Sequence, residues 1–252
     1  MDSLSLLFRG NLCPLLSVPA SDGTVWYPLT RRASIKDIIE ALGVPHTEIG
    51  SLLANGSEID FNYQPGAGDH VEVLPHHPPV DPCRASLLRP QPLAAIRFLV
   101  DVNVAKLAPL LRMIGMDTAF DKEGKDARLA EFARNQQRIL LTRDTALLKR
   151  KQVVFGHLLR SQHPPLQLRE VVDLYGLRNR LRPFCRCLLC NGELLPVAKL
   201  TISHRLEPLT KKYYHDFRRC PECDKIYWPG SHREKMAALI AQLFTPSQPI
   251  SS

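Results

Sequence analysis

The sequence of 252 residues exceeds a typical single domain, so two or three compact units are expected. An apolar fraction of 44% and a charged fraction of 23% argue against wholesale disorder. No apolar run is long enough for a transmembrane helix, and the N-terminus lacks the basic segment of a signal peptide. A cytoplasmic protein is therefore expected. The net charge of +8 is uneven, with −5 over residues 1–80 and +13 over residues 81–252, and the basic part favours a nucleic-acid partner over a generic solvated surface.

The first 75 residues predict a small unit of strands and one helix. Strands are expected over residues 3–8, 25–29 and 68–74, and a helix over residues 35–42 with Ser34 as its N-cap and Gly43 at its end. Asn55-Gly56 is a strong turn signal. The order β-β-α-β-β resembles the β-grasp, ubiquitin-like fold, in particular the small domain found beside certain nuclease domains.

The chain continues beyond this unit instead of ending in Gly-Gly, as sulfur-carrier β-grasp proteins do. A carrier role is therefore not expected for this unit. The remaining expectation is that it interacts with a protein partner or positions the rest of the chain. Prolines are frequent between residues 75 and 92 and predict a stiff, extended linker, placed at residues 78–94. His76 and His77, beside this linker, are expected to be exposed and to bind nothing.

Residues 95–180 alternate between strand-like and helix-like segments. Strands are expected over residues 96–101, 117–121, 138–142 and 153–155, and helices over residues 107–114, 126–135, 145–150 and 166–175. Such alternation implies a parallel sheet with helices on its faces. In sheets of this kind, ligands bind outside the carboxyl ends of the strands.

Acids lie at the predicted carboxyl ends of three of these strands. Asp101 ends the first strand, Asp121 ends the second, and Asp144 lies two residues beyond the third, while Asp126 begins the helix near the second. Grouped carboxylates repel one another unless a cation lies among them, and oxygen ligands suit Mg²⁺ or Mn²⁺. Such ions activate water and stabilise a phosphodiester transition state. Each acid taken alone could instead be a turn residue or a helix cap.

The residues around these acids resemble the Mut7-C RNase family of the PIN-like nuclease superfamily. The resemblance is carried by FLVD at residues 98–101, LLRMIG at 110–115 and, most specifically, RILLTRD at 138–144. It spans about residues 95–240, and the first 75 residues resemble the ubiquitin-like domain that often precedes this family's nuclease domain. The resemblance implies metal-dependent cleavage of RNA, with Asp101, Asp126 and Asp144 as catalytic metal-binding acids and Asp121 as a further candidate. Two lysines interrupt residues 121–126, where family members often have a denser acidic stretch.

Two Cys-x-x-Cys pairs, Cys187/Cys190 and Cys220/Cys223, lie 29 residues apart and are typical of a zinc ribbon. Four thiolates give closed tetrahedral coordination, so the predicted Zn²⁺ is structural. Cys185 is a spare thiol that could substitute for Cys187. A redox pair is the alternative, but two matched pairs in an apparently cytosolic chain favour zinc. A last helix is expected over residues 234–244.

Basic residues near the acids and the cysteines are candidate RNA contacts. They are Lys106, Arg112, Arg143, Lys149, Arg150, Arg182, Arg186, Arg218 and Arg219. Aromatic residues are interleaved with basic ones around the second cysteine pair, and stacking beside backbone-binding cations suits single-stranded RNA. A solvated helix face and the small core of the ribbon are the alternatives for parts of these sets.

The sequence therefore predicts an α/β metal-dependent ribonuclease in which a zinc ribbon aids RNA binding. The expected units are a β-grasp domain (residues 1–77), the linker (78–94), a PIN-like RNase domain (95–180) and the ribbon with its helix (181–246). The expected cofactors are catalytic Mg²⁺ or Mn²⁺ and structural Zn²⁺. Two hypotheses stay open beside this one: a catalytically weak module that binds RNA or a ribonucleoprotein, and a redox or zinc sensor.

Overall fold

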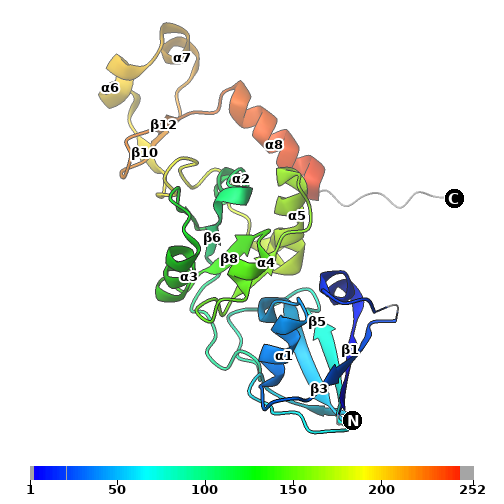
Figure 1. The fold of residues 1–252 in the computed structure, drawn as a ribbon. Coiled ribbons are helices and arrows are strands. Elements are labelled where there is room, and N and C mark those ends of the chain that lie inside the picture. The colour runs from blue at the N-terminus through cyan, green and yellow to red at the C-terminus, as the bar shows by residue number, and fades with distance from the viewer. Residues whose placement is uncertain (1–2, 21, 245–252) are drawn as a thin grey trace, which may run out of the picture.

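The computed structural model describes residues 3–20 and 22–244. Figure 1 shows a head (residues 3–75) at one end, an α/β body (residues 96–181) in the middle and a ribbon (residues 182–230) at the other end. Within the described ranges, none of the helices has the length and apolar character that crossing a bilayer requires.

The head is a five-stranded mixed sheet with one helix packed on it. Its strands are β1 (Ser3–Phe8), β2 (Thr24–Pro28), β3 (Ile49–Ala54), β4 (Ser57–Glu58) and β5 (His70–Pro75), in the order β2-β1-β5-β3-β4. The central strands β1 and β5 are parallel, and the other neighbours are antiparallel. Burial alternates along β1, because Leu4, Leu6 and Phe8 face the helix side while the residues between them lie on the outer face.

The local signals of the head act as predicted. Helix α1 (Ile35–Ala41) begins after Ser34, whose Oγ accepts a hydrogen bond from Asp37 N at 3.2 Å. Asn55 and Gly56 both have positive φ, 50° and 83°, and form the hairpin turn between β3 and β4. Two short 3-10 helices, η1 (Gly10–Leu15) and η2 (His46–Glu48), complete the unit.

The proline-rich segment after the head is packed into the molecule, which corrects the expectation of an extended spacer. Leu88 belongs to the core of the head, and Leu93 belongs to the core of the body. Val80 N donates a hydrogen bond to Leu174 O at 2.7 Å. His76 was expected to be exposed but is half-buried, and its Nε2 donates to Thr47 O at 2.9 Å. Proline content indicates local stiffness and carries no information on these distant contacts.

The body is a four-stranded parallel sheet. Its strands are β6 (Phe98–Val100), β7 (Thr118–Phe120), β8 (Ile139–Thr142) and β9 (Gly156–Leu158), in the order β7-β6-β8-β9. Strand β9 begins three residues later than the predicted strand at 153–155, and Val153 is instead a buried residue of the mostly exposed loop before it. Apolar content marked the buried segment correctly but did not fix the register of a strand this short.

Helices cover both faces of this sheet. The body's helical elements are η3 (Val102–Val104), α2 (Leu107–Met113), α3 (Asp126–Asn135), α4 (Thr145–Leu148), α5 (Pro164–Leu174) and η4 (Leu177–Arg180). Phe98 and Val100 of β6 point into the core formed with α2 and α5, whereas Leu99 between them points into the core formed with α3 and α4. The strands are therefore buried on both faces, as parallel strands usually are.

The ribbon is a small antiparallel sheet of β10 (Leu195–Val197), β11 (Phe217–Arg219) and β12 (Ile226–Tyr227). An excursion that the sequence did not predict, with α6 (Lys199–Ile202), η5 (Ser203–Arg205) and α7 (Pro208–Tyr213), connects β10 to β11. Helix α8 (Ser231–Phe244) then runs from the ribbon back to the body beside α5 (Figure 1), where Leu243 joins the body's core.

Candidate functional site

The carboxyl ends of β6 and β8 meet where the strand order of the body reverses. From β6 the chain proceeds to β7 on one side and then returns to β8 on the other side. In register, Val100 lies beside Phe120 of β7 and Leu141 of β8. Asp101, Asp121 and Thr142 therefore lie next to one another where β6, β7 and β8 end. We use the name acidic edge for this end of the sheet and for its acids Asp101, Asp121, Asp126 and Asp144. Ligands of open α/β sheets bind at such a reversal point.

Asp101 is buried at this edge, with 4% of its surface exposed. Its Oδ2 accepts a hydrogen bond from Thr142 Oγ1 at 2.7 Å, and its Oδ1 accepts one from Val102 N at 2.5 Å. Thr142 Oγ1 in turn accepts a hydrogen bond from Asp144 N at 3.0 Å. One hydroxyl thus connects the carboxylate of Asp101, which follows β6, to the backbone amide of Asp144, which follows β8.

Asp144 lies at the acidic edge and also caps a helix, so the predicted edge position and the alternative interpretation as a helix cap are both correct. Its Oδ1 accepts hydrogen bonds from Ala146 N at 2.7 Å and Leu147 N at 3.2 Å at the start of α4. Asn103 also belongs to the edge, because its Nδ2 donates to Thr142 Oγ1 at 3.3 Å and its Oδ1 accepts from Arg143 N at 3.3 Å. Asn103 had no signal in the sequence, whereas Thr142 lies inside the RILLTRD segment.

Asp121 and Asp126 are each paired with an arginine. Asp121 Oδ2, a buried atom without a hydrogen bond, lies 2.8 Å from Arg128 Nε in an ion pair. Asp126 Oδ2 lies 3.5 Å from Arg150 Nη2. Among residues 3–20 and 22–244, the cysteines form the one group of at least three Cys, His, Asp or Glu ligands close enough to hold an ion. Thr142 thus contacts the Asp101 carboxylate and the backbone amide of Asp144, the Asp144 carboxylate caps α4, and Asp121 and Asp126 are paired with cationic side chains.

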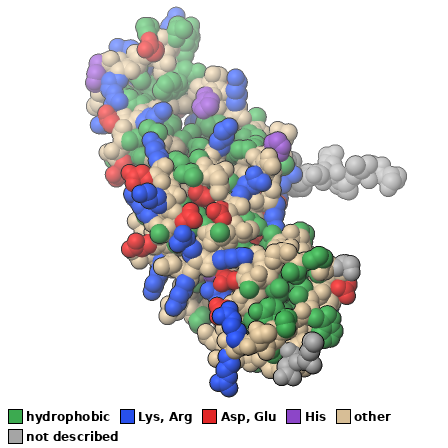
Figure 2. Space-filling view, viewed as in Figure 1, with side chains coloured by type: hydrophobic (Ala, Val, Ile, Leu, Met, Phe, Trp, Pro, Cys, Tyr) green, Lys and Arg blue, Asp and Glu red, His purple; other side chains and the backbone are tan. Residues whose placement is uncertain are grey.

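The candidate RNA contacts near this edge divide into exposed and buried residues. Lys106, Arg143 and Arg150 are exposed and Lys149 is half-buried. Figure 2 shows basic and acidic side chains side by side over the middle of the molecule, where the body lies in Figure 1. A phosphate backbone approaching the acids would meet these cations.

Arg112 corrects the prediction of an RNA contact. It is 5% exposed, and its Nε donates to Thr118 O at 2.9 Å. Its Nη1 donates to the backbone oxygens of Leu188 and Leu189 at 2.9 and 2.8 Å. The Arg186 side chain is also engaged in a contact within the protein, since its Nε donates a hydrogen bond to Gly115 O at 3.2 Å. Both arginines fasten the ribbon to the body, and Arg112 has no surface to offer a phosphate.

The four predicted cysteines converge in the ribbon. Their Sγ atoms lie within 4.8 Å of one another, with Cys187 and Cys223 at 3.5 Å and Cys190 and Cys220 at 3.3 Å. Tetrahedral zinc with bonds of about 2.3 Å needs sulfur atoms about 3.8 Å apart, so the four thiols fit this ion. Cys185 is not a member of the group, and the expectation that it could replace Cys187 is wrong for this arrangement.

The two cysteine pairs have the same backbone shape. The residue after the second cysteine of each pair is left-handed, with φ of 76° at Asn191 and 64° at Asp224. In the first pair, Asn191 N donates to Cys187 O at 3.0 Å, and in the second pair Asp224 N donates to Cys220 O at 2.9 Å. Burial opposes ionisation of Cys187, but hydrogen bonds from Tyr227 and from backbone amides outweigh it and lower the pKa of this thiol to about 6. The thiolate of Cys187, which is the zinc-binding form, is thereby favoured, whereas burial and hydrogen bonds with neighbouring thiols raise the pKa of Cys190 to about 12.

The ribbon is attached at the amino ends of the body's strands, and the acids lie at their carboxyl ends. Asn191 Oδ1 accepts a hydrogen bond from Thr118 N at 2.9 Å, and Asn191 Nδ2 donates to Asp117 Oδ1 at 2.9 Å. Asp117 immediately precedes β7, whereas Asp121 immediately follows it. At about 3.3 Å per strand residue, the attachment point and the acidic edge are separated by roughly 13 Å.

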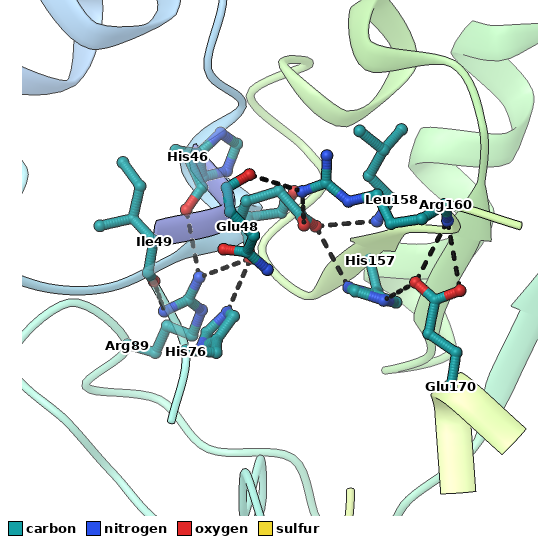
Figure 3. A network of polar contacts seen from close by, with 11 residues as sticks. His46, Glu48, Ile49, His76, Arg89, His157, Leu158, Arg160 and Glu170 are labelled. Atoms are coloured by element: carbon teal, nitrogen blue, oxygen red, sulfur yellow. Dashed lines mark hydrogen bonds and ion pairs between the residues drawn. The ribbon is translucent and has the colours of Figure 1, made fainter. Parts of the chain in front are cut away.

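The head is joined to the body by a buried network of charged side chains (Figure 3). Glu48 of the head accepts a hydrogen bond from Leu158 N at 2.8 Å and pairs with His157 at 3.3 Å and Arg160 at 3.3 Å. His157 Nε2 donates to Glu170 Oε1 at 2.9 Å. From the segment after the head, Arg89 donates to Ile49 O at 3.0 Å and to the backbone oxygens of residues 46 and 47 at 3.2 Å. The sequence did not indicate this network, because its members are far apart along the chain.

Two histidines of this network have shifted pKa values. Burial alone would lower the pKa of His157, but hydrogen bonds to Glu170 and Glu48, and the charges of both acids, outweigh burial and raise it to about 9. Burial, followed by the charge of Arg89, lowers the pKa of His76 to about 4. In the folded chain at neutral pH, His157 is therefore charged and His76 is neutral.

These shifts predict how stability depends on pH. The contribution of His157 is complete below its unfolded pKa of 6.5 and is lost as the pH rises through about 9. The contribution of His76 is present above 6.5 and is lost as the pH falls through about 4. Above pH 6.5, we expect the free energy of unfolding to fall less steeply in His157→Gln than in the unsubstituted chain, by up to about 1.4 kcal/mol per pH unit. Urea unfolding at several pH values measures this slope, and equal slopes would contradict the assignment.

Comparison with protein-family models gives two matches. Residues 96–240, more than half of the chain, match the family described as the Mut7-C RNAse domain, and residues 1–81 match the one described as Mut7-C ubiquitin. No curated protein matches the chain, and no solved structure does. The first match covers the body, the ribbon and most of α8, and the second covers the head.

Proposed function

The chain belongs to the Mut7-C RNAse domain family, and from this premise we propose that it is a metal-dependent ribonuclease that hydrolyses RNA phosphodiester bonds. The observation that carries the proposal is the pair of acids at the reversal point of the sheet. Asp101 is buried there, and the Thr142 hydroxyl that donates to its carboxylate also accepts a hydrogen bond from the backbone amide of Asp144 at the same edge. A buried carboxylate beside other acids is costly unless a cation compensates it.

Asp101, Asp126 and Asp144 are the residues proposed to hold Mg²⁺ or Mn²⁺, with Asp121 as a further ligand. The donor set fits such ions because all of its atoms are carboxylate oxygens. When bound, a divalent ion supplies an activated water and neutralises charge on the phosphodiester. Thr142 orients the Asp101 carboxylate, while Arg143, Lys149 and Arg150 contact the RNA backbone.

Arg128 and Arg150 are proposed to exchange partners when substrate and metal bind. Each now lies beside an acid, Asp121 or Asp126, at 2.8 and 3.5 Å. The Asp126–Arg150 pair is exposed on both sides and contributes little to stability, so it opens at small cost. The Asp121 side chain is only 10% exposed, so its pair with Arg128 opens at a larger cost, which a bound cation would offset. Released from the acids, the two guanidinium groups are free to pair with phosphates, which they recognise well.

The same two ion pairs favour a second candidate function, a catalytically weak module that binds RNA without cutting it. In that case Arg128 and Arg150 would replace the metal permanently. In both functions, the zinc ion held by Cys187, Cys190, Cys220 and Cys223 is structural, and the ribbon contributes to RNA binding.

The proposal is tested with the purified full chain in its zinc-loaded form and an end-labelled RNA. We expect cleavage when Mg²⁺ or Mn²⁺ is added and none when both are withheld. Binding without cleavage in the presence of either ion would favour the binding module. Cleavage at the same rate with and without added ion would contradict the metal-dependent mechanism.

A further inference from the structure

A large groove lies between the ribbon and the first turns of α8. Its volume is about 1200 Å³. One wall is the sheet of β10, β11 and β12, and the other is formed by residues 228–236 at the start of α8. Pockets that enclose one small molecule measure about 300–1,000 Å³, so this groove has room for a segment of a polymer.

Cations predominate among the charged side chains of the groove. Arg218 on β11 and Lys225 before β12 line it and are both exposed. Asp216 is the one acid among the described lining residues. Arg219, the next residue on β11, was also predicted to contact RNA, but it does not line the groove and is ion-paired with Asp224, so we do not place it in the binding site. Adjacent residues of a strand point to opposite faces, and this separates the two arginines.

Aromatic rings line the same groove. Trp228 is 39% exposed, and Tyr214 is half-buried. The two rings are neighbours across Gly230, where an added Cβ would lie 3.0 Å from Trp228 Nε1 and 3.6 Å from Tyr214 Oη. Tyr213, adjacent to Tyr214, is 64% exposed but does not line the groove. Figure 2 shows hydrophobic and basic side chains interspersed at the ribbon end of the molecule.

We propose that this groove binds single-stranded RNA, with bases stacked on Tyr214 and Trp228 and the phosphate backbone held by Arg218 and Lys225. The inference rests on the proposed function and names its substrate class. Only unpaired nucleotides present base faces to aromatic side chains, so the combination of rings and cations selects single strands over duplex. The ribbon is fastened at the sheet edge opposite the acids. The groove is therefore a binding site separate from the acidic edge, and it holds RNA that extends beyond the reacting nucleotide.

The test is a binding titration of a fluorescein-labelled oligouridine with the zinc-loaded full chain, without Mg²⁺ or Mn²⁺ so that the RNA stays intact. Tyr214→Ala and Arg218→Ala are each expected to raise the Kd about tenfold. Tyr213→Ala and Arg219→Ala, the adjacent controls, are expected to change it less than twofold. Tyr214→Phe keeps the ring and is expected to bind normally. Zinc content of each variant is measured in parallel, so that loss of folding is separated from loss of contacts.

The outcomes separate this inference from the proposed ribonuclease activity. If the unsubstituted chain cleaves RNA while Tyr214→Ala and Arg218→Ala bind oligouridine normally, the groove assignment is wrong and the activity stands. If the groove variants lose binding but no cleavage occurs with Mg²⁺ or Mn²⁺, the groove stands and the activity fails. Equal loss in the groove variants and their controls, or equal binding of a matched RNA duplex, would also overturn the groove assignment.

Discussion

Replacing Cys220 by serine is expected to abolish zinc binding and to unfold the ribbon. The buried core of the ribbon consists of Cys187, Leu194 and Cys220, with Cys223 and Tyr227 packed against it, so apolar burial alone cannot hold this sheet together. Structural zinc contributes an apparent 10–16 kcal/mol, about as much as the whole stability of a small domain. Metal analysis should find one zinc per unsubstituted chain and none per Cys220→Ser chain.

Cys185→Ser is the matched control for this prediction. Cys185 lies two residues before Cys187 but outside the cysteine group, so this variant should keep its zinc and its resistance to protease. Protease should cut the ribbon of Cys220→Ser first, and the head should survive because it has its own core. A Cys220→Ser protein that retains zinc, or a Cys185→Ser protein that loses it, would show that the metal site is assigned incorrectly.

Glu48→Ala is expected to destabilise the whole chain by about 3–5 kcal/mol, because it removes one of the two carboxylates that compensate the buried charge of His157 and leaves the backbone amide of Leu158 without its acceptor. The Glu48 side chain is 3% exposed, and its two oxygens face His157, Arg160 and the backbone amide of Leu158. Hydrogen bonds and charge from His157 lower the pKa of Glu48 despite the opposing effect of burial, so the side chain is ionised in the folded chain. Equilibrium unfolding in urea measures the loss.

The control is Glu72→Ala, which removes an acid of the same head from a more exposed ion pair. Glu72 lies 3.4 Å from Arg9, whose side chain is 53% exposed. Such pairs contribute about 0–1 kcal/mol. If Glu48→Ala were as mild as Glu72→Ala, the network in Figure 3 would not join the head to the body, and the head would be an independent appendage.

Elements defined by local patterns could be predicted from the sequence. Helix α3 begins at Asp126 and ends at Asn135, as its apolar periodicity predicted. The two cysteine pairs were predicted equally well, because their ligand spacing is imposed by the metal. Strand β9 was displaced by three residues, since a short buried segment has no alternation from which its register could be read.

Features that depend on distant parts of the chain could not be predicted. Arg112 resembles a surface cation on an amphipathic helix, yet its partners are carbonyls of residues 188 and 189 in the first cysteine pair. Glu48 and His157 are separated by the entire length of the linker and most of the body. The acids of the edge were predicted individually, but the Thr142 bridge and the arginine partners of Asp121 and Asp126 depend on tertiary packing.

The central claim is that the acidic edge holds the ion that cleaves RNA, and the cleavage rate of Asp101→Asn tests it most directly. Asparagine preserves size and one of the two hydrogen bonds that Asp101 accepts from Thr142 and Val102, but it removes the charge that the cation needs. The control is Asp173→Asn, which removes an exposed acid on α5 that pairs with Arg178 at 2.8 Å. With Mn²⁺ or Mg²⁺ and labelled RNA, Asp101→Asn is expected to cleave at least about a hundredfold more slowly while still binding RNA, and Asp173→Asn is expected to cleave normally. Equal cleavage by Asp101→Asn and the unsubstituted chain would place the active site elsewhere.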